Sequence, residues 1–88
     1  MIRNKDFEIV TIADEKIAVP VGEEAAAFHG VVALSASAAF LLYSLNEPHT
    51  SNELIDILLK EYDINRETAE KEIKEIIPKL MELKLIKE

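Results

Sequence analysis

The side chains best suited to hold a metal ion in this chain are its two histidines, His29 and His49. A segment whose pattern predicts a helix separates them, and neither belongs to an HxxxH or HExxH arrangement. The chain has no cysteine, so thiolate ligands and disulfides are excluded. We therefore expect no metal ion and no cofactor, with one histidine in a turn and the other in a loop, both facing water.

Nucleophilic catalysis would need a serine or threonine beside a histidine and an orienting acid. The hydroxyl residues are better explained as helix caps or small helical residues, and they are Ser35, Ser37, Thr50 and Ser51. Glu75 stands four residues from both Lys71 and Lys79, which is typical of a solvated helix face rather than of a proton-sharing acid pair. Two glycines are too few for a phosphate-binding loop. We predict that the chain is not an enzyme.

The composition fits a single globular domain over residues 1–88. Apolar residues make up 49% of the chain, which has only two glycines and three prolines. The net charge of −7 argues against a nucleic-acid partner, because that affinity comes largely from Lys and Arg displacing counterions. The start of the sequence lacks the apolar run of a signal peptide, and the absence of cysteine favours a reducing compartment. We expect an unprocessed cytoplasmic protein.

A stretch without charged residues, VVALSASAAFLLYSL from Val31 to Leu45, raises the question of a membrane span. Polar residues and a glycine interrupt it and its flanks, namely His29, Gly30, Ser35, Ser37, Ser44 and Asn46. Its pattern also changes from that of a strand to that of a helix. The sequence therefore predicts no membrane span, and the stretch is better explained as a strand that leads into a buried helix.

Three segments have the alternation or β-branched content of strands. Residues 7–13, FEIVTIA, form the first, and residues 16–21 return after a tight turn at Asp14 and Glu15. These two should pair antiparallel. Residues 31–34 are the third predicted strand.

Two helices are predicted after the third strand. Ser35 can cap a helix over residues 36–45. TSNE, residues 50–53, has the spacing of a capping box and predicts a second helix that ends near Tyr62. Residues 22–30, bounded by glycines, fit either a loop or a small hairpin.

The third predicted helix, capped by Asn65, is the longest. Its apolar residues recur at spacings of four, three, four and three, at Ala69, Ile73, Ile76, Leu80 and Leu83. A second apolar line runs through Ile77 and Met81. Pro78 removes a backbone hydrogen bond and clashes with the carbonyl of Lys74, so we expect a kink or a break into two helices.

The third strand would lie at an edge of the sheet and carries no charge to protect that edge. An open edge beside an apolar groove can accept an extended peptide as an additional strand. The alternative is that the third helix covers the strand and every apolar residue belongs to the core. The residue pattern alone favours this alternative, since apolar runs are usually core.

Two long runs carry a family resemblance, VPVGEEAAAFHGVVALSASAAFLLYSL and TSNELIDILLKEYDINRETAEKEIKEIIPKLMELKLI. In order and spacing, the sequence from Phe7 to Ile86 resembles the PqqD family of pyrroloquinoline quinone biosynthesis. The matching positions are Pro20, Gly22, Phe28, Gly30, Leu34, Ala38, Ala39, Leu45, Thr50, Glu53, Leu54, Tyr62, Leu80 and Leu85. The chain departs from the family at Ser35, where Asn is usual, at Leu42, where Trp is common, and at Lys84, where Gly often stands.

The resemblance implies an α+β fold in which a small three-stranded antiparallel sheet packs on three helices in a winged-helix-like arrangement. It also implies a non-catalytic adaptor. Family members are similar in holding the leader segment of a ribosomally made precursor peptide as an added strand against the third strand. The third helix forms the other wall of the groove, and the peptide is presented to a modifying enzyme, often a radical S-adenosylmethionine protein.

Applied to this sequence, the resemblance gives a candidate peptide-binding site. The residues expected to offer their backbone to the peptide are Val31, Val32, Ala33 and Leu34. The residues expected to line the groove are Ile73, Ile77 and Met81. Ile76, Leu80 and Leu83 are assigned to the core, and an error of one position in the helix phase would rotate every assignment by about 100°.

Two other functions remain open at this point. A winged-helix DNA-binding domain is built from similar elements, but it would need a basic recognition helix, and the charges of the third helix are close to balanced. The chain could instead be a structural homodimer that covers the edge of its third strand with a second copy.

Overall fold

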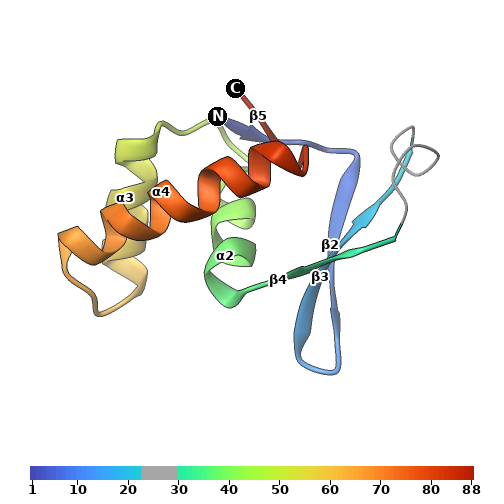
Figure 1. The fold of residues 1–88 in the computed structure, drawn as a ribbon, viewed down its shortest axis with the longest axis horizontal. Helices are drawn as coiled ribbons and strands as arrows, with labels where there is room; N and C mark the ends of the chain where they lie inside the picture. Colours follow the sequence, from blue (N-terminus) through green and yellow to red (C-terminus); the bar gives the residue numbers. More distant parts are fainter. Residues whose placement is uncertain (23–29) are drawn as a thin grey trace.

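The computed structural model describes residues 1–22 and 30–88. Within these residues four strands are followed by three helices and a last short strand, the strands form two antiparallel sheets, and the hairpin of β2 and β3 projects beyond the helices (Figure 1). The elements are β1 (Ile2–Arg3), β2 (Phe7–Ile12), β3 (Glu15–Pro20), β4 (Val32–Leu34), α2 (Ala36–Ser44), α3 (Ser51–Glu61), α4 (Arg66–Glu82) and β5 (Ile86–Lys87). The predicted α+β class, with a three-stranded antiparallel sheet and three helices, is confirmed. The question of a loop or a hairpin after Gly22 falls on residues 23–29, outside the described residues.

The larger sheet has the strand order β2-β3-β4, and each of its strands begins and ends within one residue of the predicted bounds. A two-residue turn at Ala13 and Asp14 joins β2 to β3, and both residues have positive φ, 50° and 68°. The sequence placed this turn one residue later. Glu15 instead belongs to β3 and pairs with Ile12.

Side chains of the sheet alternate between two faces. The inner sheet face, turned toward the helices, carries Phe7 and Ile9 of β2, Ala18 of β3, and Val32 and Leu34 of β4. Phe7 and Ala18 are buried in the core, and the other three pack against it. The covered face of the sheet thus continues directly into the helical core.

The described helices α2, α3 and α4 begin at the caps that the sequence predicted. The Ser35 hydroxyl accepts a bond from the Ala38 N–H at 3.1 Å. Thr50 and Glu53 form the reciprocal capping box, with bonds of 3.2 and 2.8 Å. The Asn65 side chain accepts from the N–H of Thr68, also at 2.8 Å.

Helix α4 is one continuous element with Pro78 inside it, so of the two expected outcomes, a kink or a break into two helices, the break does not occur. After the helix, Lys84 donates to the Met81 carbonyl and Leu85 to the Leu80 carbonyl. These two bonds form a Schellman ending, which places Lys84 in the left-handed region at φ 61°. Glycine, which often stands at this position in the family, adopts this conformation without a steric penalty.

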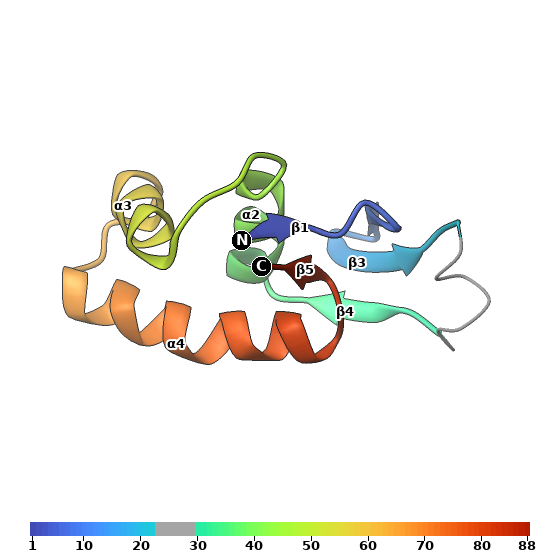
Figure 2. The same ribbon diagram turned by 90° about the horizontal axis from the view of Figure 1, so that it is seen from above.

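The small sheet of β1 and β5 was not predicted. Ile2 pairs with Lys87 and Arg3 with Ile86, so the two chain ends lie side by side (Figure 2). Two-residue strands are too short to show an alternation, and their pairing depends on contacts between distant parts of the sequence. Among residues 1–22 and 30–88, no helix has both the length and the apolar character needed to cross a membrane.

Candidate functional site

Strand β4 lies at an edge of the larger sheet, with β3 as its described neighbour. The direction of its backbone groups follows from the hairpin. The residues that flank a two-residue turn, here Ile12 and Glu15, form a hydrogen-bonded pair. Backbone groups alternate in direction along a strand, so those of Lys16 and Ala18 point away from β2 and toward β4.

The register of β4 then decides which of its backbone groups point away from β3. Leu34 pairs with Lys16 and Val32 pairs with Ala18, so the backbones of Leu34 and Val32 face β3. Ala33 lies between them and directs its N–H and C=O outward. A guest strand would therefore bond to Ala33, while its neighbours in β4 hold the sheet together.

A groove runs between β4 and the C-terminal half of α4, which lie side by side in Figure 2. Its volume is about 190 Å³. The lining residues are Val32, Ala33, Leu34, Ser35 and Ala38 on one side, and Ile76, Lys79, Leu80 and Leu83 on the helix. Leu80 is buried, but the other apolar residues of the helix wall are only half-buried. An apolar ligand would thus remove further apolar surface from water.

The structure places the helix residues predicted to line the groove away from the lining of this groove. Ile73 and Ile77 are buried, with 4% and 8% of their surface exposed, and they line a separate pocket between α3 and α4. Met81 is half-buried against the core. Ile76 and Leu83, which the sequence assigned to the core, instead face β4. This difference arises from tertiary packing. One face of α4 packs against α3 and the adjacent face flanks β4, and the sequence alone does not show which face meets which neighbour.

The four residues predicted to offer their backbone to the peptide differ in position, because the backbones of Val32 and Leu34 face β3. Val31 precedes β4 and is 59% exposed. Val32 and Leu34 give side chains to the groove. Ala33 gives backbone groups to the edge, a distinction that required the register of the hairpin.

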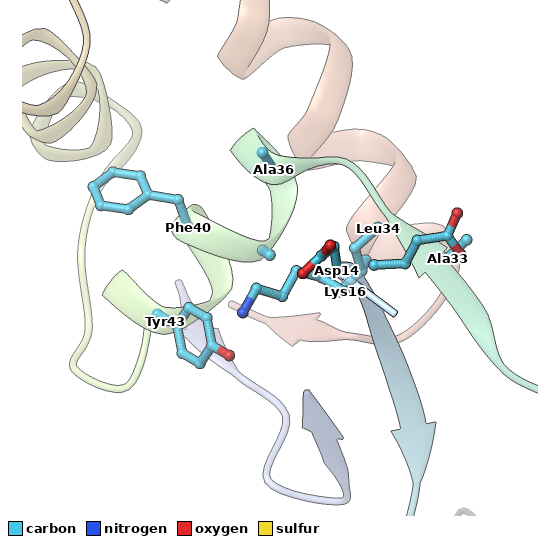
Figure 3. A pocket seen from close by; sticks show the side chains of 9 residues that line it. Asp14, Lys16, Ala33, Leu34, Ala36, Phe40 and Tyr43 are labelled. Carbon is cyan, nitrogen blue, oxygen red and sulfur yellow. The ribbon is translucent and has the colours of Figure 1, made fainter. Parts of the chain in front are cut away.

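A third concavity, of about 450 Å³, lies between the hairpin turn, the end of β4 and α2. Figure 3 shows the Lys16 ammonium directed toward the Tyr43 ring, and the ammonium lies 6.0 Å from the ring centroid. Lys16 also donates to the Thr11 hydroxyl at 2.7 Å. Asp14 and Glu15 line the same concavity, so its charges are mixed.

The described residues include no group of three histidine or acidic side chains that could hold a metal ion. Nδ1 of His49 lies 3.9 Å from the Glu53 carboxylate. The backbone N–H of Thr50, bonded to that carboxylate, lowers the pKa of Glu53 below its ordinary value of 4.5. This perturbed group belongs to the cap of α3 and not to the groove.

The sequence model of the family described as Coenzyme PQQ synthesis protein D (PqqD) matches residues 8–86. The chain belongs to the PqqD family. The PqqD-type fold also matches a solved structure, described as TbiB1 in complex with the TbiA(beta) leader peptide. The TM-score is 0.72 and the identity 20%, over 97% of this chain and 93% of the other. At that identity the likeness shows a shared fold. No curated protein matches this PqqD-family chain.

Proposed function

We propose that this chain is a non-catalytic adaptor that binds the leader segment of a ribosomally made precursor peptide and presents it to a peptide-modifying enzyme, of the radical S-adenosylmethionine type. Membership of the PqqD family supports the proposal, as does the shared fold with TbiB1, which was solved with a leader peptide. The single observation that carries it is the edge strand β4, which opens onto a half-buried apolar groove.

In the proposed complex the leader adds a strand beside β4 and exchanges main-chain hydrogen bonds with Ala33. Every second side chain of the leader enters the groove between Val32 and Leu34 on one wall and Ile76 and Leu83 on the other. Lys79 lies exposed in the lining of the groove and would add at most about 1 kcal/mol by pairing with an acidic leader residue. Affinity therefore comes from main-chain bonds and apolar burial.

The substitution Ala33→Pro tests strand addition directly. Proline removes the outward N–H of Ala33 but no donor that faces β3, so the sheet should remain folded. Affinity for a synthetic leader peptide of the proposed precursor should fall about tenfold or more in isothermal titration calorimetry. The matched control is Ala33→Val, which keeps the N–H and should bind nearly as well as the unmodified chain.

Two results would overturn the proposal. One is unchanged leader affinity in a folded Ala33→Pro protein. The other is no binding by the unmodified chain, with self-association instead. The competing occupant of the β4 edge is a second copy of the chain, and sedimentation at several concentrations distinguishes it from the leader.

A further inference from the structure

The face of the larger sheet opposite the helices has an apolar centre. It carries Val10 and Ile12 of β2, Ile17 and Val19 of β3, and Ala33 of β4, which the pairing register places side by side. None of these five belongs to the described core or packs against it, and Ile12 is 58% exposed. We call these five residues, with the adjoining Val31, the outer sheet face.

The charges of the outer sheet face are of one sign. Glu8 and Glu15 project from it by the same alternation, and both are exposed. Asp14 is exposed at the hairpin turn beside them. Lys16, the basic residue of the hairpin strands, lies on the inner sheet face. The apolar patch is therefore bordered by carboxylates.

We infer that the outer sheet face is the docking surface for the modifying enzyme, and that the enzyme meets it with an apolar patch bordered by Lys and Arg. Apolar contact at the centre and opposite charges at the rim are the usual composition of such an interface. A second copy of the chain fits poorly, because a face-to-face pair would bring Glu8 and Glu15 of both copies together. Each copy also carries a net charge of −7.

The outer sheet face adjoins the proposed leader-binding edge of β4, and the following step rests on the proposed function. Ala33 directs its backbone toward the proposed leader and its side chain toward the outer sheet face. A leader strand beside β4 would place every second side chain in the groove and the others in line with the outer sheet face. An enzyme docked there would contact the adaptor and the bound leader together.

The double variant Ile12→Ser/Glu15→Lys tests the inference, because both positions are exposed and lie on the hairpin rather than on β4. The probe is the purified peptide-modifying enzyme of the proposed function, with affinity measured by biolayer interferometry. We expect a loss of about tenfold or more for the enzyme and unchanged affinity for the synthetic leader peptide. Tyr43→Ser, which removes an exposed aromatic residue from α2, is the matched control and should leave both affinities unchanged.

The possible outcomes are distinguishable. Unchanged enzyme affinity in the double variant overturns the inference, as does an enzyme that does not bind the unmodified chain. Equal losses in the double variant and in Tyr43→Ser also overturn it, because the contact would not then be specific to the outer sheet face. If the unmodified chain binds the enzyme but not the leader, the proposed function fails instead.

Discussion

The side-chain amide of Asn4 donates a 2.9 Å hydrogen bond to the backbone carbonyl of Lys84, across nearly the whole length of the sequence. Asn4 is 5% exposed, and its side-chain oxygen accepts a bond from the Asp6 N–H at 3.0 Å. Its backbone N–H also donates to the Leu85 carbonyl at 2.8 Å. One buried polar residue thereby holds the N-terminal segment to the end of α4.

Replacing Asn4 with alanine should lower the free energy of unfolding by about 1–3 kcal/mol, because the Lys84 carbonyl and the Asp6 N–H would each lose a partner. Urea denaturation measures the change. Asn52→Ala, at an exposed position of α3, is the control and should stay within about 0.5 kcal/mol of the unmodified chain. Equal changes in the free energy of unfolding for the two substitutions would show that the side-chain bonds of Asn4 do not stabilise the fold.

The neighbours Ile76 and Ile77 should respond differently to aspartate. Ile77→Asp would bury a carboxylate without a partner and should unfold the protein or destabilise it by several kcal/mol. Ile76→Asp changes a half-buried groove residue, so the circular dichroism spectrum should be retained while leader affinity falls. Urea denaturation and calorimetry provide the two measurements. If Ile76→Asp unfolds the protein while Ile77→Asp only weakens leader binding, Ile77 lines the groove, as the sequence predicted.

The pKa of Glu53 predicts a specific pH dependence. Because the bond from the Thr50 N–H lowers this pKa in the folded chain, the unfolded chain takes up the proton first as the pH falls below 4.5. The stabilisation from the capping box is therefore complete above that pH and is lost as the pH falls through the lowered folded pKa. Thermal melts between pH 7 and 3 should show a smaller decline for Glu53→Gln, whose amide does not titrate in this range. Identical declines for the two proteins would contradict this role.

Lys84→Gly should stabilise the chain. The left-handed conformation is costly for a residue with a Cβ, whereas glycine adopts it freely but loses more entropy on folding. The net gain in the free energy of unfolding should be on the order of 0.5 kcal/mol. Lys84→Ala retains the Cβ and should show no such gain in the same urea titration. A gain from alanine equal to that from glycine would point to the loss of the lysine charge.

Local signals predicted much of this fold. Ser35, Thr50 and Asn65 identify helix starts through bonds to residues three positions ahead, so a short window of sequence contains the whole interaction. Alternation and β-branched content likewise predicted the three strands of the larger sheet. These features need no knowledge of distant contacts.

The groove depended on information that the sequence does not contain locally. Ile76 and Ile77 are adjacent on α4, and only the packing of that helix between α3 and β4 decides which of them faces the groove. The outward backbone of Ala33 depends in the same way on the position of the hairpin turn. If the turn were shifted by one residue, the backbone of Ala33 would face β3 instead of the outer edge.

The pairing of β1 with β5 has a practical consequence for protein engineering. With Met1 and Glu88 at neighbouring points of the surface, the whole domain could be spliced into a loop of a larger protein through two short connectors. Such an insertion would replace one loop of the host without stretching it, at a small cost in loop-closure entropy. A natural fusion to a catalytic domain would face the same favourable geometry.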